Sequence, residues 1–139
     1  MLARRSGIRS IESSISWLEA SKLPLCLLTP NMQNRQLLDS VFREAGTSPN
    51  IVVETDSVLA LYAHVLSAGL FTIAPHSLLS LIEMRHELTA IPLHPPLHRQ
   101  IGLVKPQQTY TPQLLKSAWN IAETLDLQER FDALISSTY

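Results

Sequence analysis

The sequence has little of what disulfide-bonded proteins and nucleotide-binding enzymes need. Its 139 residues contain one cysteine and four glycines, and the glycines do not cluster. One cysteine excludes an internal disulfide, and Cys26 lies in the apolar run 23–28, where a small buried side chain is a simpler interpretation than a reactive thiol. Glycine-rich phosphate-binding loops and the glycine-flanked serine of many hydrolases are also absent. The sequence therefore excludes the common nucleotide-binding and serine-hydrolase motifs.

Excess charge of one sign and long hydrophobic runs are lacking as well. The formal net charge is −1, so electrostatics gives no reason to expect binding to nucleic acid or to an acidic membrane surface. No apolar stretch approaches the roughly 20 residues that a membrane-spanning helix needs. Arg4 and Arg5 are not followed by the apolar core of a signal peptide. We therefore expect a cytoplasmic protein without a membrane anchor.

Residues with catalytic or metal-binding chemistry are scattered. His94 and His98 are four positions apart, but two prolines lie between them, so the two histidines cannot share a helix face as metal ligands. Glu54 and Asp56 are close in sequence, but a strand end and a helix start explain both carboxylates. We expect no catalytic residue, no metal ion and no cofactor, and a small α/β enzyme is the weakest of the functions considered.

Apolar runs alternate with amphipathic segments along most of the chain. The run at 25–28 is continuous rather than alternating, which is typical of a strand covered on both faces in a parallel sheet. Gly46 and Gly69 follow helical segments and are suited to end them, and Thr111-Pro112 is a strong helix start. The predicted order is a flexible lead-in over 1–13, a short helix capped by Ser13 or Ser14 and ending near 21, a strand at 25–28, a helix at 32–45, a strand at 51–54, a helix at 58–67, a strand at 70–74, a helix from 76 to about 85, an extended segment at 88–93, a strand at 99–104, a helix at 112–125 and a last helical piece at 128–135.

This alternation predicts an α/β fold. Strands that alternate with helices form a mostly parallel sheet with right-handed crossovers. We therefore expect three layers, with helices on both faces of a mostly parallel sheet, and an additional C-terminal helix.

Small polar residues follow three of the predicted strands. In open α/β sheets, ligands bind outside the carboxyl ends of parallel strands, and helix N-termini at such ends favour anions. Each residue taken singly is explained as a helix cap, but the three loops together favour a site for a small anionic molecule. The candidate ligand-binding residues are Thr29, Pro30, Asn31, Thr55, Asp56, Ser57, Pro75 and His76.

Four stretches, taken in order, resemble the effector-binding domain of LysR-type transcription regulators. The first holds Leu23-Pro24-Leu25 through Pro30, followed by Asn34-Arg35 and Asp39. The others are Ile51-Val52-Val53-Glu54-Thr55-Asp56-Ser57 with the four residues after it, the segment 65–75, and Ala90-Ile91-Pro92-Leu93 with the later segment 99–104. No single stretch is specific, but their order and spacing over residues 15–105 favour this family.

The resemblance implies half of a two-lobed sensor with a type 2 periplasmic-binding-protein fold. Residues 14–97 correspond to the second subdomain, and residues 98–139 to the strand and helix that return to the first. It also implies a small-molecule effector and a homodimer formed through the helix at 33–45 and the strand at 51–54. We expect contact with DNA only through a helix-turn-helix domain, which this sequence does not contain.

The resemblance leaves two features open. Half of the family's ligand cleft is missing from these 139 residues, and the apolar side of the helix at 112–125 lacks its usual neighbours, so we expect it to be covered by self-association or by a different arrangement. An alternative function is a stand-alone interaction module that pairs with an intact regulator. The effector's identity cannot be predicted from the sequence.

Overall fold

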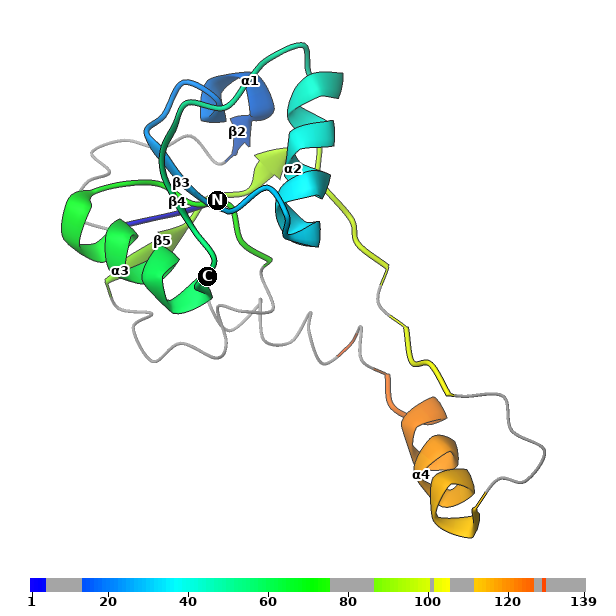
Figure 1. Cartoon of the computed structure of the whole chain (residues 1–139). Helices are drawn as coiled ribbons and strands as arrows, with labels where there is room; N and C mark the ends of the chain where they lie inside the picture. Colours follow the sequence, from blue (N-terminus) through cyan, green and yellow to red (C-terminus); the bar gives the residue numbers. More distant parts are fainter. Residues whose placement is uncertain (5–13, 76–86, 101, 106–111, 127–128, 130–139) are drawn as a thin grey trace. The chain divides into compact units, whose positions relative to one another are not determined.

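The computed structural model describes residues 1–4, 14–75, 87–100, 102–105, 112–126 and 129. It divides the chain into two compact units, Met1–Leu97 and His98–Tyr139, which are treated separately below (Figure 1). The division falls where the sequence analysis separates the two subdomains, although the assignment of each unit to a subdomain stays a prediction. Among the residues described, no helix is long and apolar enough to cross a membrane.

Among the residues described, the first unit contains short strands and three helices, and the second unit contains one helix of 11 residues. In chain order the elements are β1 (Leu2–Arg4), β2 (Ile15–Ser16), α1 (Trp17–Ala20), β3 (Leu25–Leu28), α2 (Gln33–Glu44), β4 (Ile51–Thr55), α3 (Val58–Ala68), β5 (Leu88–Ala90), β6 (Leu93–His94) and, in the second unit, α4 (Gln113–Glu123).

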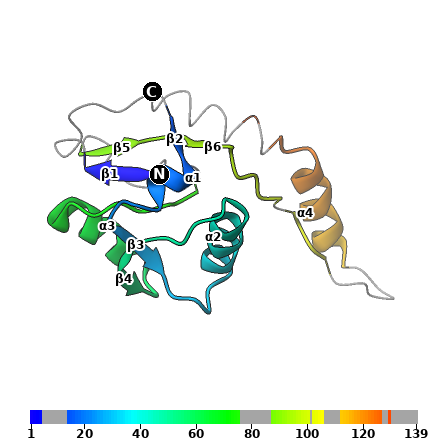
Figure 2. The same cartoon turned by 90° about the horizontal axis from the view of Figure 1, so that it is seen from above.

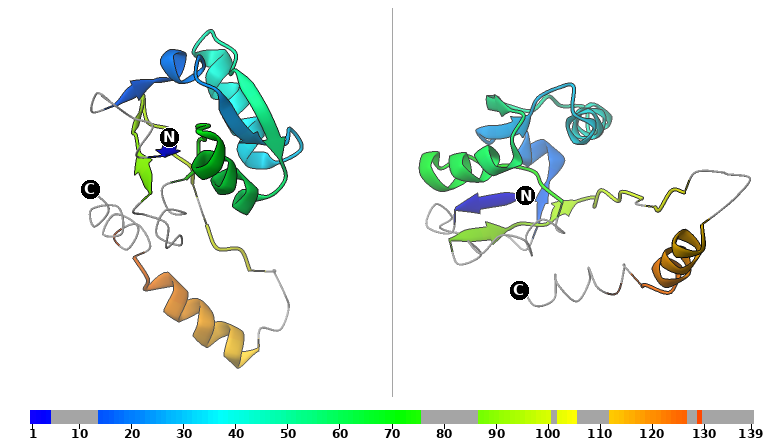
Figure 3. Two further views of the ribbon diagram at one scale, coloured as in Figure 1. Left: turned by 90° about the vertical axis from the view of Figure 1, so that its left-hand side faces the viewer. Right: turned by 60° about the horizontal axis from the view of Figure 1, so that its bottom comes forward.

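The strands of the first unit form a mixed sheet. Strand β3 pairs with β4 in parallel, and on its other side Leu25 forms a parallel bridge with Phe71. The neighbouring Thr72 bridges antiparallel to Leu2, and β1 in turn pairs antiparallel with β5, beside which it lies in Figure 3. A separate pair, β2 and β6, is parallel. The order across the main sheet is therefore β4, β3, the segment at 71–72, β1 and β5.

Strand β3 is buried on both faces, as its continuous apolar run predicts. Leu25 and Leu27 belong to a core cluster that includes α1 and α2 residues, whereas Cys26 and Leu28 pack on the opposite side with Leu61 of α3. Figure 2 shows α2 and α3 on opposite sides of β3. The predicted layering of helix, sheet and helix is therefore present in the first unit.

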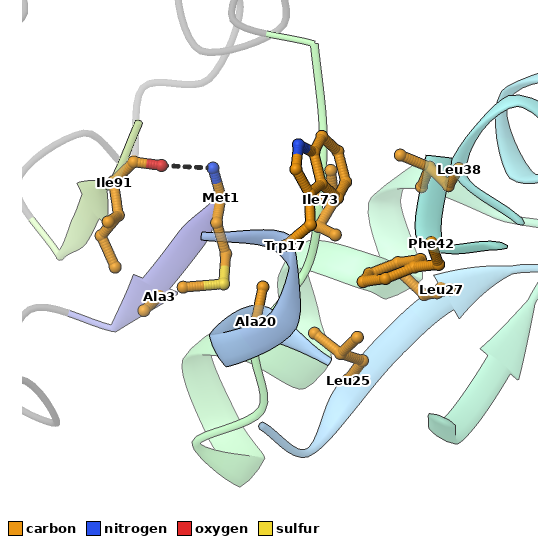
Figure 4. Packing of buried hydrophobic residues seen from close by; sticks show 10 residues of the cluster. All are labelled: Met1, Ala3, Trp17, Ala20, Leu25, Leu27, Leu38, Phe42, Ile73 and Ile91. Atoms are coloured by element: carbon orange, nitrogen blue, oxygen red, sulfur yellow. Dashed lines mark hydrogen bonds between the residues drawn. The ribbon is translucent and has the colours of Figure 1, made fainter. Parts of the chain in front are cut away.

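The larger core cluster joins the N-terminal strand to α1 and α2. Trp17 meets Phe42 edge to face, with ring centroids 5.3 Å apart and an interplanar angle of 87°, a favourable arrangement of aromatic rings. Ala3 of β1 and Met1, the residue before this strand, belong to the same cluster (Figure 4). The Met1 amino group donates a hydrogen bond of 2.6 Å to the backbone oxygen of Ile91.

Glycine ends two of the helices, as the sequence predicts. At the end of α2, Gly46 has φ +69°, its N–H donates to the Arg43 oxygen, and the Thr47 N–H donates to the Phe42 oxygen. This pair of bonds is the Schellman motif, which the left-handed backbone of glycine allows. Helix α3 ends at Gly69, whose φ is +66°.

Two expectations about the first unit are wrong. Residues 2–4 form strand β1 with Met1 in the core, not a flexible lead-in, because their place in the sheet between distant segments orders them; residues 5–13 lie outside the described residues. The cap of α1 is Ser16, whose hydroxyl accepts from the Glu19 N–H, rather than Ser13 or Ser14. The predicted mostly parallel pairing holds for β3 with β4 and for β2 with β6, and β1 is antiparallel to its neighbours.

Other expectations hold in part. The predicted strand at 70–74 contributes bridges at Phe71 and Thr72 only, and the described residues of 99–104 form no strand. Helix α4 begins at Gln113 with Pro112 as N-cap, one position later than predicted. The predicted helices at 76–85 and 128–135, together with Thr111, lie wholly or largely outside the described part of the chain.

Candidate functional site

The carboxyl end of β3 leads into a tight turn. The Met32 N–H donates to the Thr29 oxygen at 3.0 Å, which closes a β-turn with Pro30 and Asn31 as its central residues. Proline is suited to this position because its fixed φ matches the first central residue of a turn. Asn31 is exposed, and it is not the cap of α2, whose N-cap is Met32. Its side chain is therefore not used to start the helix.

The carboxyl end of β4 is a small network of hydroxyl and backbone groups. The Ser57 N–H donates to the Thr55 hydroxyl oxygen at 3.2 Å, and the Ser57 hydroxyl oxygen accepts from the Ala60 N–H at 3.3 Å. Ser57 is thus the N-cap of α3, as a serine at this position predicts. Asp56 is exposed between them. Both hydroxyl groups keep a proton that can be donated to a ligand.

These two strand ends are joined to each other. The Thr29 N–H donates to the Thr55 oxygen at 3.0 Å, one residue beyond the end of β3. The Thr29 hydroxyl oxygen is buried and has no hydrogen-bond partner. Two of the three loops predicted to form one site therefore lie side by side at the same edge of the sheet, which we call the effector edge (29–31 and 55–57).

The third loop follows the segment that runs parallel to β3 at Phe71. Its first residue, Pro75, is partly buried, and parallel direction brings the end of this segment toward the same edge. His76 lies outside the described residues, so its part in the site stays a prediction.

A buried arginine, which the sequence analysis did not select as a site residue, lies directly under the effector edge. The guanidinium of Arg35 donates to the backbone oxygen of Leu28 at 2.8 Å and to a Glu54 carboxylate oxygen at 2.5 Å. Its Nε donates to Asp39 at 2.8 Å. The spacing of Arg35 and Asp39, four apart on one helix, was a signal for that pair, but nothing local indicates the contact with Glu54.

Charge at this edge is predominantly negative among the residues described. Burial lowers the pKa of Arg35, but the hydrogen bonds and charges of Asp39 and Glu54 outweigh this effect, so its pKa lies above the ordinary value. Two carboxylates thus face one guanidinium, and Asp56 adds a further exposed carboxylate nearby. The positive ends of α2 and α3 act in the opposite sense. An anion at this edge depends on these helix ends and on hydroxyl groups.

The surface predicted to form a dimer is exposed. Among the described strands β4 has β3 as its only neighbour, and Val52, the second residue of β4, is 56% exposed. Its neighbour α2 presents polar residues such as Gln36 and Arg43 to solvent. An edge strand with free backbone groups is suited to pairing with another chain.

The second unit has exposed apolar side chains on α4. Among the residues described, none of α4 is buried, and Leu114 is 83% exposed. Trp119 lies under the Lys105 ammonium, 4.5 Å from the ring centroid, and its ring N–H donates to Glu123. The expected covering of the apolar side of this helix stays a prediction.

Metal-binding residues do not gather in the part of the chain that the structure describes. No group of three or more histidine, cysteine or acidic side chains there could hold a metal ion.

Comparisons with known proteins agree with this architecture. A protein-family model, the LysR substrate binding domain, matches residues 4–125. Among solved structures, the chain is similar to HinK, a LysR family transcriptional regulator from Pseudomonas aeruginosa, with a TM-score of 0.53 and 20% sequence identity over 69% of this chain and 34% of HinK. The chain thus spans about a third of that regulator's length. A search of curated proteins gave no significant match.

Proposed function

The chain belongs to the LysR substrate-binding domain family, and from that membership we propose that it senses a small molecule at the effector edge. The family is regulatory rather than enzymatic, and the fold is the mixed α/β fold of these domains. The effector is proposed to be a small anionic metabolite that bridges the loops after β3 and β4. Pro75 and His76 are proposed to complete the site from the third loop.

One observation carries this proposal. The hydrogen bond from Thr29 to Thr55 places two polar loops side by side at the carboxyl ends of parallel strands, where open α/β sheets bind ligands. The hydroxyl groups of Thr55 and Ser57 each accept from a backbone N–H and keep a proton to donate. A ligand oxygen at this edge can accept from both of them.

The test is a thermal-shift screen with small carboxylates and inorganic phosphate. We expect at least one anion to raise the melting temperature of the wild-type chain and to leave that of the double variant Thr55→Ala/Ser57→Ala unchanged. Loss of the α3 cap alone costs about 1 kcal/mol, so the variants are compared by ligand-dependent shift rather than by absolute melting temperature. An undiminished shift in the double variant would remove these residues from the site.

A matched control separates binding from helix capping. Ser67→Ala removes a serine from the other end of α3, where its hydroxyl donates to the Ala63 oxygen, and is expected to keep the full ligand-dependent shift. Ser57→Asp keeps a capping oxygen but adds negative charge, and is expected to retain stability while losing the anion. Equal shifts in Ser57→Asp and wild type would contradict an anionic effector.

We also propose that the chain forms a homodimer through α2 and β4. The open edge of β4 and the exposed Val52 support this proposal. Sedimentation at micromolar concentration is expected to show a dimer, and a strict monomer would count against it. Contact with DNA is proposed to require a helix-turn-helix domain, and the cytoplasm is the proposed location.

The same open edge favours one alternative, a module that pairs with an intact regulator. Such a module would join a full-length subunit through α2 and β4 without contributing a DNA-binding domain. Co-purification with a full-length regulator, together with no anion-dependent thermal shift, would favour this alternative over metabolite sensing.

A further inference from the structure

Arg35 is buried, unlike the other charged side chains that the structure describes in the first unit. It is 6% exposed, and its guanidinium contacts three separate parts of the fold: the last residue of β3, a residue of β4 and the next turn of its own helix. Burying a guanidinium is unfavourable unless its donors find acceptors. Here the acceptors are one backbone oxygen and two carboxylates, so the charge is paired.

Two of these acceptors lie next to the residues that join the two loops. Leu28 immediately precedes Thr29, and Glu54 immediately precedes Thr55. Thr29 and Thr55 are the residues whose backbone bond joins the two loops. One rigid guanidinium therefore holds the residue before the donor of that bond and the residue before its acceptor.

We propose that Arg35 is the positioning residue of the effector edge: it sets the separation of the β3 and β4 strand ends and holds both against the start of α2. This inference rests on the proposed function, since it gives the edge its geometry for a ligand. Because α2 is also half of the proposed dimer surface, Arg35 links the ligand loops to the subunit interface through a single side chain.

Arginine is suited to this task in a way that lysine is not. Its planar fork carries five donors in fixed directions, and here Nε and Nη1 serve different elements at the same time. A lysine ammonium is a single charged point on a flexible stem. It can pair with Glu54 or with Asp39, but it does not hold the Leu28 oxygen, Glu54 and Asp39 in one plane.

The experiment is amide hydrogen exchange by NMR on the chain without ligand. The reporter is the Thr29 N–H, which donates to Thr55, and the reference is the Leu25 N–H, which donates to Asn50 at the other end of β3. We expect Arg35→Met to speed exchange at Thr29 by about tenfold relative to Leu25, because one buried hydrogen-bond network is lost locally. Arg35→Lys is expected to behave as Arg35→Met does at Thr29.

A second pair of variants keeps the test open if Arg35→Met does not fold. The Glu54 side chain is 43% exposed, so Glu54→Ala removes the β4 contact with little loss of packing, and it is expected to speed Thr29 exchange selectively. Asp39→Asn disturbs only the contact within α2 and is expected to leave Thr29 unaffected. Each variant alters one acceptor of the Arg35 guanidinium. Glu54→Ala removes a carboxylate, and Asp39→Asn replaces a carboxylate with an uncharged amide.

Each outcome decides the proposal. Selective acceleration at Thr29 in Arg35→Met, Arg35→Lys and Glu54→Ala, but not in Asp39→Asn, supports it. Equal acceleration at Thr29 and Leu25 shows a contribution to overall stability only and overturns it, as does full protection in Arg35→Lys. Because no ligand is present, a negative anion screen would refute the proposed function without touching this result.

Discussion

The buried amino group of Met1 makes the stability of the 139-residue chain depend on pH in a definite direction. The amine is bound to the Ile91 oxygen at the junction of β1 and β5, and burial lowers its pKa from 8.0 to about 6. An amine with a lower pKa in the folded state binds fewer protons there than in the unfolded chain. The free energy of unfolding is therefore highest above pH 8 and falls as pH falls toward 6.

The size of the effect follows from the two pKa values. At about 1.4 kcal/mol per pH unit, and with titration starting and ending gradually, lowering the pH from 8 to 6 removes about 2 kcal/mol from the free energy of unfolding. Urea unfolding at pH 6, 7 and 8 measures this loss directly. Below about pH 5 the amine contributes little further loss, because both states are then protonated.

The control is a chain whose N-terminus is acetylated, since acetylation removes the titrating amine and keeps a hydrogen-bond donor. Every other ionisable group is the same in the two proteins, so its contribution cancels in the difference between them. We expect the acetylated chain to lose about 2 kcal/mol less between pH 8 and pH 6. Parallel pH dependence in the two proteins, or higher stability of the free amine at pH 6, would refute the burial of this group.

Three further predictions follow from the packing, the backbone and the open sheet edge. Phe42→Ala is expected to lower the free energy of unfolding by about 4 kcal/mol in urea, because Phe42 is fully buried against Trp17; a loss below about 1 kcal/mol would contradict that packing. Gly69→Ala is expected to cost about 1 kcal/mol, since φ is +66° and nothing lies within 4 Å of the added Cβ. Val52→Lys is expected to change stability by less than about 0.5 kcal/mol yet shift sedimentation toward monomer, and an unchanged dimer would exclude β4 from the interface.

Local patterns were sufficient to predict the elements around β3 and β4. The continuous apolar run at 25–28, the glycines after α2 and α3, and the serine before α3 each act within a few residues, and all were found where predicted. The effector edge followed from these elements, because parallel strands end on the same side of a sheet. The sequence alone is therefore sufficient to predict that Thr29 and Thr55 lie close together.

Features that depend on distant partners were not predictable in the same way. Residues 2–4 are too few to show a period, and only their fit between Thr72 and β5 makes them a strand. An apolar run likewise does not show whether its neighbour is parallel or antiparallel. Arg35 was overlooked as a site residue for the same reason, since its contact with Glu54 joins two elements.

The segment at 99–104 shows the opposite case. Its apolar and β-branched residues favour a strand, but a strand needs a neighbour to satisfy its backbone groups. The described residues of 99–104 are assigned to no strand, and Val104 is almost fully exposed. Residue propensity alone is therefore not sufficient to predict a strand here.

The position of β1 has a consequence for how the chain folds. Met1 is bound to a residue 90 positions away, so the middle of the sheet cannot close until nearly all of the first unit is available. Contacts between residues so far apart in the sequence stabilise the fold only after a large loop has closed. A small domain that depends on such contacts is expected to fold slowly. During synthesis residues 2–4 emerge from the ribosome long before β5 does. Until β1 and β5 have paired, the sheet at 71–72 is incomplete. This domain is therefore expected to fold late and to be prone to strand-mediated association while it does so.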